Sequence, residues 1–447
     1  MTIINENVAP FLTLLGNAGF SGGEPDWLKA VRKGGSERYA VLGLPHVKLE
    51  EWKYTNLQPL GEIAYRAVSA ADGDVAIDAI PGLGDASKGS ARLVLVNGCY
   101  RADLSDTTSL PEGVRLEPLD EALRTNPDWL EQNLGRMADG DTRALVALNN
   151  AAFDTGYVLH VAKGVAVAAP IEIVCMGGYV DDAVISFPRN LIVMEEGAEA
   201  RVVVSHVGSA IGEYLSNGVT EITVAQNAVL RLTTLQEDSM AAAHLSTTFV
   251  SIARDGVFES FTLSMGGRMT RNDSHVTLDG SGAECRLDGA YLMRGRQHCD
   301  NTTRVEHRVP NTSSDEMFKG VLDDEARAVF QGKIVVERDA QKTDGQMLNK
   351  TMLLSNQAEI DTKPELEIYA DDVKCAHGAA SGQIDETALF YLRSRGIPEA
   401  QARNLLIQSF MGQVVDRIAD DTLRALVIDK IVHWLPAACY RQEGWRG

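Results

Sequence analysis

Short alternating segments recur through residues 157–370, and this repeat constrains the fold more than any other feature of the sequence. Each copy places a turn residue and a small residue before alternating apolar positions, as in Gly197-Ala198 and Asn227-Ala228. The small residues fall at positions 198, 228, 256, 283, 326 and 358, so the steps are 30, 28, 27, 43 and 32 residues. A unit of this size, made of strands alone, cannot bury its own apolar face and must stack on the next unit. The repeat therefore predicts a mainly β solenoid. The competing fold is a β-sandwich, whose strands also recur every ~8–12 residues.

Helical patterns precede the repeat. Residues 1–85 contain helix-like pieces at 10–15 and 25–32, a break at Gly34-Gly35-Ser36 and a Gly-, Asp- and Ala-rich linker at 70–90. The β core is predicted over residues 86–380. It begins with a buried strand at 92–96, which Asn97-Gly98 ends, and it contains a helical interlude near 117–137.

Helical patterns return over residues 381–447. A first helix covers residues 384–393 and stops at Gly396, Pro398 suits the first turn of a second helix, and Asp420 or Asp421 caps a third. Such helices either cover the open sheet edges of a solenoid or dock another protein. The candidate docking residues are Phe390, Leu405, Leu406 and Phe410.

Charge and cysteine usage limit the possible partners and compartments. The chain has 62 acidic against 42 basic residues, a formal charge of −20, which argues against nucleic acid and anionic membranes as partners. The most apolar stretch, residues 158–176, is interrupted by Lys163, Pro170 and Glu172, and the N-terminus has no signal-peptide pattern. The six cysteines form no CxxC pair, which fits a reducing cytoplasm.

Common enzyme motifs are absent from the sequence. There is no phosphate-binding G-x-x-x-x-G-K-[ST] loop, no G-x-G-x-x-G, no G-x-S-x-G and no H-E-x-x-H. The sequence does not exclude a pair of glycosidase-type catalytic carboxylates, because the distance between the two carboxyl groups depends on the three-dimensional structure. A carbohydrate-active β-helix enzyme is therefore the enzyme alternative, although aromatic residues make up only 6% of the chain.

Two groups of residues carry possible metal chemistry. In an extended strand Cys375 and His377 point to the same side, and a thiolate with an imidazole is a ligand pair suited to iron or zinc. Two ligands do not complete a tetrahedral site, so others must come from elsewhere in the chain or from a partner. The second group contains His298 and His307, either as ligands or proton carriers or, as we favour, as residues that satisfy backbone groups within the solenoid wall.

With these residues in view, the chain resembles the SufD family of iron–sulfur cluster assembly proteins. The likeness spans nearly the whole chain and is weakest between residues 65 and 140. It is carried most densely by FQGKI at 330–334, AQKTDG at 340–345, DTKPELEI at 361–368, ADDVKCAHG at 370–378, GQIDE at 382–386 and LFYLRSRGI at 389–397. The H-x-D-x-x-T-x-V-x-H run at 298–307 and WKYT at 52–55 match as well.

This resemblance implies a right-handed parallel β-helix flanked by N-terminal and C-terminal helical domains. It implies a non-catalytic scaffold subunit that works with a SufB-like paralogue and a SufC-like ABC ATPase, which the C-terminal helices contact. A transient iron–sulfur cluster would form at the interface with the paralogue, where His377 matches the family's ligand and Cys375 lies nearby. A purely structural adaptor is a further alternative. Flavin involvement and homodimer formation stay open.

Overall fold

The computed structural model describes residues 9–15, 23–68, 72, 89–178, 181–208 and 212–435. The linker predicted at 70–90 lies largely outside the described residues, as does Cys439. Within the described part of the chain, no helix is both long and apolar enough to cross a membrane.

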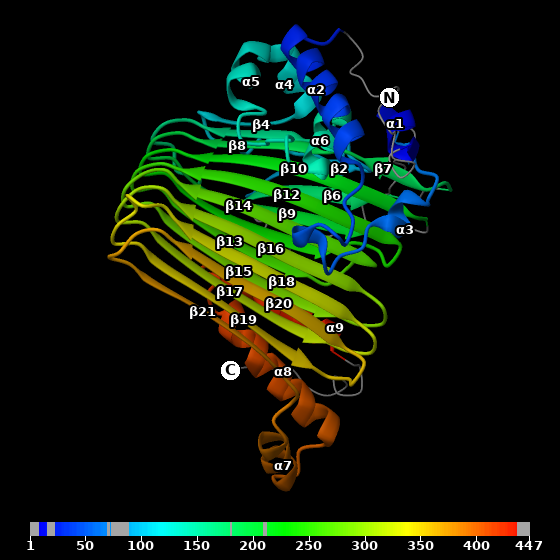
Figure 1. The fold of residues 1–447 in the computed structure, drawn as a ribbon, viewed down its shortest axis with the longest axis vertical. Coiled ribbons are helices and arrows are strands. Elements are labelled where there is room, and N and C mark those ends of the chain that lie inside the picture. Colours follow the sequence, from blue (N-terminus) through cyan, green and yellow to red (C-terminus); the bar gives the residue numbers. More distant parts are fainter. Residues whose placement is uncertain are drawn as a thin grey trace.

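Helices gather at one end of the molecule (Figure 1). They are α1 (Ala9–Leu15), α2 (Asp26–Leu42), α4 (Leu119–Thr125), α5 (Pro127–Asn133) and α6 (Ala144–Ala152). A 3₁₀ helix (Glu50–Trp52) and α3 (Gln58–Gly61) lie lower in this view, beside the strands. The break predicted at Gly34-Gly35 is wrong, because α2 continues through it. Gly35 is required by close packing, since a Cβ there would lie 2.7 Å from both the Ala147 oxygen and the Ala151 nitrogen of α6.

The helical interlude predicted near 117–137 is present as two short helices, α4 and α5, which separate at Asn126-Pro127. Helix α6 was not predicted. Its sequence, ALVALNNAA, is buried on nearly all sides, so it lacks the polar face from which a helix is recognised.

The rest of the core consists of two sheets. The first strands are β1 (Arg66–Ala67), β2 (Ala91–Val96), β3 (Cys99–Tyr100), β4 (Val114–Pro118), β5 (Tyr157–Val161), β6 (Ile171–Gly177), β7 (Val184–Ser186) and β8 (Arg189–Met194). The regular turns follow as β9 (Glu199–Gly208), β10 (Tyr214–Val224), β11 (Val229–Glu237), β12 (Ala242–Ile252), β13 (Val257–Ser264), β14 (Met269–Leu278), β15 (Glu284–Met293), β16 (His298–His307), β17 (Ser313–Leu322), β18 (Arg327–Val336), β19 (Asp344–Leu353), β20 (Glu359–Ile368) and β21 (Lys374–Gly382).

Successive strands alternate between the two sheets, which confirms the β-helix and excludes the sandwich. One sheet, called sheet A, runs β20-β18-β16-β14-β12-β10-β8-β5-β4, with β1 and β7 beside it; sheet B runs β21-β19-β17-β15-β13-β11-β9-β6-β2-β3. The strands β9 to β21 of the regular β-helix pair in parallel with their neighbours. The pairs β2–β3 and β4–β5 are antiparallel. The largest apolar cluster among the described residues lies between the sheets.

The small residues of the repeat lie at buried corners. Ala198, Ala228 and Ala283 are fully buried and each precedes a strand of sheet B. The residues before them, Gly197, Asn227 and Gly282, have positive φ angles, which allow the chain to turn tightly. Ala326 and Ala358 precede strands of sheet A instead. The step of 43 residues therefore marks a change from one corner of the β-helix to the opposite one.

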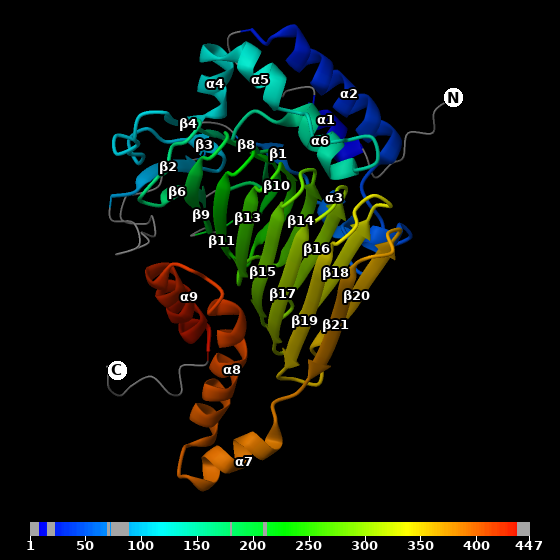
Figure 2. The same cartoon turned by 90° about the vertical axis from the view of Figure 1, so that its left-hand side faces the viewer.

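Three helices follow the last strand, as predicted: α7 (Glu386–Ser394), α8 (Glu399–Val415) and α9 (Asp421–Trp434). The Asp385 and Asp420 side chains accept hydrogen bonds from the first amides of α7 and α9, so Asp420 is the cap of the third helix. Figure 2 shows α8 and α9 beside the outer face of the β-helix. Helix α8 packs there on β15 and β17.

Candidate functional site

The β-helix ends in two strands that each pair on one side only. Within the described residues, β20 pairs with β18, β21 pairs with β19, and neither has a second partner strand. Ile360 and Leu366 on β20 are only half-buried, and Ile368 is 39% exposed. A strand edge with free N–H and C=O groups can pair with another chain. This end of the molecule is therefore chemically suited to an interface.

Cys375 and His377 both lie on the terminal strand β21. They pair in register with Gly345 and Met347 of β19, and Met347 points into the core. Because side chains on a strand alternate, Cys375 and His377 face the same way, toward the open end of the interior. Cys375 is half-buried against the core, whereas His377 is exposed. Burial raises the pKa of the Cys375 thiol, with an opposing hydrogen bond from the Gly345 backbone.

Within the described part of the chain, no third ligand lies beside this pair. Among the described residues, no group of three His, Cys, Asp or Glu side chains is arranged to hold a metal ion. Among the described residues, Cys375 and His377 therefore do not form a complete metal site by themselves. His377 is accessible from outside the chain.

His298 and His307 do not lie with that pair. The His298 Nε2 is 2.9 Å from the Thr55 hydroxyl, and burial lowers its pKa while Asp300 opposes the shift. His307 is fully buried, with Nδ1 2.7 Å from the Thr312 hydroxyl and Nε2 2.9 Å from the Ser314 hydroxyl. Burial lowers its pKa to about 4. Both histidines thus make hydrogen bonds, but their partners are side-chain hydroxyls and not the backbone groups that we favoured. Arg304 and Glu306, on the other face of β16, pair at 2.6 Å.

The four candidate docking residues divide into two pairs. Phe390 on α7 is 73% exposed and Leu405 on α8 is 42% exposed. Leu406 and Phe410 instead pack against the C-terminal core, and the Lys319 ammonium lies 4.2 Å from the centre of the Phe410 ring. Tyr391 is also 58% exposed. The accessible apolar surface of these helices is therefore Phe390, Tyr391 and Leu405.

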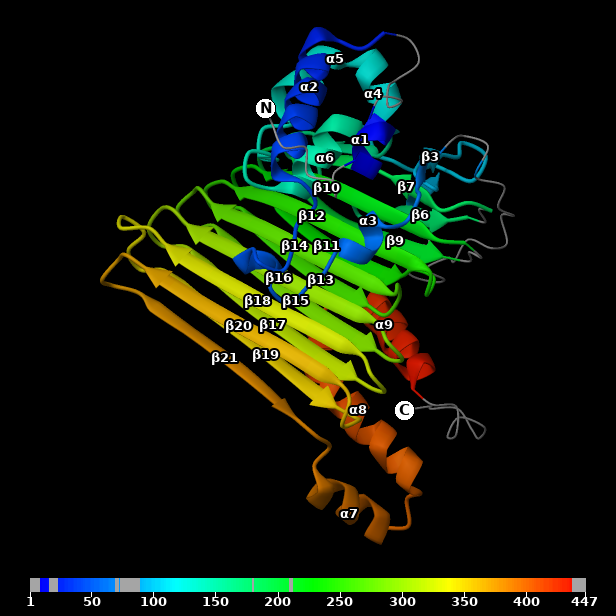
Figure 3. The same cartoon turned by 45° about the vertical axis from the view of Figure 1, so that its right-hand side comes forward.

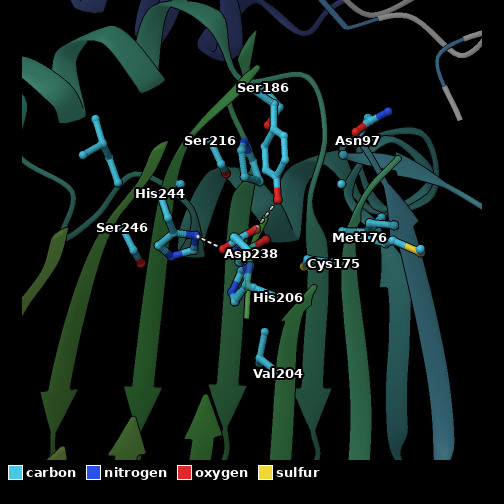
Figure 4. A pocket seen from close by; sticks show the side chains of 18 of the residues that line it. Asn97, Cys175, Met176, Ser186, Val204, His206, Ser216, Asp238, His244 and Ser246 are labelled. Carbon is cyan, nitrogen blue, oxygen red and sulfur yellow. Dashed lines mark hydrogen bonds and ion pairs between the residues drawn. The ribbon is translucent and has the colours of Figure 1, made fainter. Parts of the chain in front are cut away.

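The structure also shows a polar cavity of about 100 Å³ between the two sheets (Figure 4). At its centre the Asp238 carboxylate accepts hydrogen bonds from the Tyr214 hydroxyl at 2.8 Å and from Gln236 Nε2 at 2.9 Å. His244 Nδ1 lies 3.3 Å from the same carboxylate. His206 packs edge-on against His244, with ring centres 4.5 Å apart.

Burial and the neighbouring charged or hydrogen-bonding groups together set the protonation of this cluster. Burial alone would raise the pKa of Asp238, but His244, His206 and Tyr214 together hold that pKa well below its usual range. Burial, with the His244 charge, lowers the pKa of His206 to about 3. Burial, with the Asp238 charge, raises the pKa of the Cys175 thiol to about 12. Near neutral pH the cavity thus contains a carboxylate, a neutral His206 and a neutral thiol.

Sequence reasoning did not find this cluster. Asp238, Tyr214 and Cys175 come from different turns, and only the register of the stacked strands brings them together. The only local signal is the presence of polar residues at inward positions, such as His206 in register with Cys175.

Two family models cover most of the chain. Residues 178–410 match the SufBD core domain of the SUF system for FeS cluster assembly, and residues 20–173 match the SufBD protein N-terminal region. The chain is 32% identical over 400 residues to the iron–sulfur cluster assembly protein SufD of Escherichia coli, covering 88% of this chain and 90% of that protein.

This chain belongs to the SufBD family.

Other SufBD relatives agree. An iron–sulfur cluster assembly SufBD family protein of Synechocystis is 30% identical over 406 residues, which is 89% of both chains. The chloroplastic protein ABCI7 of Arabidopsis thaliana is 30% identical over 338 residues, which is 74% of this chain and 71% of that protein. SufBD membership makes this an iron–sulfur cluster assembly protein of the SufD type, and it leaves the carbohydrate-active interpretation without support.

Proposed function

We propose that this chain is a non-catalytic, cytoplasmic scaffold subunit of the Suf machinery. Its terminal strands pair with a SufB-like paralogue, and His377, with Cys375 beside it, supplies this chain's share of the ligands for a nascent iron–sulfur cluster. The cluster is the cargo of the assembly reaction. The observation that carries the proposal is the position of Cys375 and His377 on a strand whose outer edge is unpaired.

The electrostatics of the pair support this assignment. The raised pKa of Cys375 keeps its thiol protonated near neutral pH in the isolated chain. Thiolate is the form that binds iron, so ligation by Cys375 requires the positive charge of the metal. The His377 imidazole is exposed and therefore accessible to a metal ion, and imidazole is the commonest metal ligand among side chains. His377 is therefore the primary ligand in this proposal, and Cys375 is the secondary one.

The C-terminal helices support a second contact. A SufC-like ABC ATPase would supply the ATP-binding motif that this sequence lacks. The exposed Phe390, Tyr391 and Leu405 give it an apolar surface to dock on, and large exposed apolar side chains are typical of such surfaces. In the absence of a SufB-like partner, the same terminal strand edges would serve to form a homodimer.

The decisive experiment compares His377→Ala with His433→Ala in the complex with both partners. His433 is an exposed histidine on α9, remote from β21 in sequence, and serves as the matched control. After anaerobic reconstitution with iron and sulfide, cluster formation is followed by visible absorbance. We expect intact complexes in both cases and at least about tenfold slower formation for His377→Ala alone, as for loss of a metal-site group.

A wild-type rate for His377→Ala would remove the ligand role. If the double variant Cys375→Ala/His377→Ala also assembled clusters at the wild-type rate within an intact complex, the chain would be a structural adaptor instead. Failure of the wild-type chain to bind a SufB-like partner would contradict the interface itself.

A further inference from the structure

A loop from the N-terminal region crosses the outer face of sheet A. We call residues 45–56 the strap. It leaves the N-terminal core next to Leu44 and returns to it at Leu57, and both of these leucines are buried in that core. Figure 3 shows the short 3₁₀ helix of the strap lying over the strands of this sheet.

The strap contacts four consecutive strands of sheet A. The ring of Trp52 stacks on the Arg271 guanidinium of β14 at 3.9 Å. The Thr55 hydroxyl donates to the Asp300 carboxylate of β16 and lies 2.9 Å from His298 on the same strand. Farther along, Gln331 of β18 donates to the Glu51 carbonyl at 3.2 Å. Finally, Lys363 of β20 pairs with Glu50 at 2.6 Å.

The contact around Asp300 is the strongest of these. Asp300 is fully buried and its carboxylate also accepts from Arg271, which is itself only 2% exposed. The Thr302 hydroxyl donates to the other carboxylate oxygen at 2.9 Å. A buried carboxylate is tolerated only when its hydrogen bonds are made, so removal of one donor is costly. Thr55, which is fully buried, is the donor that the strap provides.

The strap reaches the strand that has least support of its own. Interior strands of sheet A are held by neighbours on both sides, whereas β20 pairs only with β18. Lys363 and Gln331 connect the strap to these two strands. Local opening is easiest where few contacts hold a segment, so additional contacts at a sheet edge lower its fluctuation.

We propose that the strap is a positioning element that holds the last strands of sheet A in place, with Thr55 as its central residue. It connects the N-terminal core to the terminal edge over four strands. The two stretches WKYT at 52–55 and H-x-D at 298–300 meet in this contact. A rigid strand edge loses less conformational freedom when it pairs, so the strap should strengthen the binding of a SufB-like partner. This consequence rests on the proposed function.

Hydrogen–deuterium exchange on the isolated chain tests the restraint directly. Thr55→Val keeps the shape of the side chain and removes the hydroxyl. We expect peptides from β20 to exchange about tenfold faster, while peptides from β13, which lies in sheet B on the other side of the β-helix, are unchanged. Thr55→Ser retains the hydroxyl and restores slow exchange. Thr233→Val, at a buried threonine of β11 in sheet B, is the matched control and leaves β20 at the wild-type rate.

Slow, wild-type exchange of β20 in a folded Thr55→Val variant would overturn the proposal. If that variant does not fold, Glu50→Gln gives the same test, because it removes only the exposed partner of Lys363. In a second measurement, a SufB-like partner is titrated onto wild type and Thr55→Val, with an expected loss of affinity of at least about threefold. Faster exchange with unchanged affinity would overturn the positioning role, whereas a wild-type chain that binds no such partner would contradict only the proposed function.

Discussion

Glu316 should make the stability of this protein fall as the pH rises through neutrality. The side chain lies on β17 and is 1% exposed, and the Thr303 hydroxyl lies near its carboxyl group. Its neighbours in register are the apolar residues Leu287 and Met347. Burial raises the pKa of Glu316 from 4.5 to about 8, against a smaller opposing effect of the Thr303 hydroxyl. The folded protein therefore retains a proton that the unfolded chain releases.

The sign and size follow from that difference in pKa. The contribution of the protonated carboxyl is complete below the unfolded pKa of 4.5 and is lost as the pH rises through the folded pKa of about 8. At 1.36 kcal/mol for each unit, the full loss in unfolding free energy is about 5 kcal/mol. Between about pH 5.5 and about pH 7.5, the loss attributable to Glu316 grows by about 2.5 kcal/mol.

The pH-dependent contribution of Glu316 to the free energy of unfolding can be measured by urea unfolding of wild type and Glu316→Gln. Unfolding is followed by tryptophan fluorescence and far-UV circular dichroism. The neutral amide has no titration, so the stability of the variant relative to wild type should increase by about 2.5 kcal/mol over that interval. Any constant cost of burying the amide cancels in the comparison between the two pH values. Glu284→Gln, at an exposed position on β15, should show no such change. A pH-independent difference between Glu316→Gln and wild type would refute the reasoning.

Two further predictions concern stability. Gly35→Ala should lower the melting temperature, because its Cβ would meet Ala147 and Ala151 at 2.7 Å and force α2 away from α6. Gly34→Ala, where nothing lies within 4 Å, should instead stabilise the same helix by about 0.5–1 kcal/mol; equal shifts in the two thermal melts would contradict this packing. The folded pKa of about 4 at His307 lies below the unfolded value of 6.5, so stability should be lost as the pH falls between them, by up to about 3 kcal/mol. This loss should disappear from urea unfolding curves of His307→Gln, and its persistence there would assign it to another group.

Much of the local structure could be predicted from patterns of neighbouring residues. The strand at 92–96 and its turn at Asn97-Gly98 are present, with positive φ angles at both turn residues. Asp420 caps the third C-terminal helix through its own nearest amides. Each of these features depends on residues only a few positions apart, and short-range steric and hydrogen-bonding preferences are sufficient to specify them.

Predictions failed where packing overrides a local preference. Gly34-Gly35 indicates a break, yet α2 continues through both residues. Glycine is needed at position 35 because α6 packs too closely there for any side chain. Leu406 and Phe410 have the composition of a docking surface, and the packing of α8 on the β-helix leaves them only partly exposed. Which apolar residues stay exposed depends on how a helix is rotated against its neighbour, and the sequence of that helix does not contain this information.

The sequence by itself determined the stacked architecture, the helices at both ends and the placement of Cys375 and His377 on one face of a strand. The spacing of apolar residues in the sequence predicts these features, because each turn of the β-helix must bury one apolar face in the same way. Only the tertiary structure decided that this strand is the terminal one, that Thr55 completes the hydrogen bonds of Asp300 across 245 positions, and that Asp238 meets Tyr214 and His244 inside the β-helix. Those contacts depend on the path of the loops and the register of the stacked strands, which involve residues too distant in the chain for any local pattern to record.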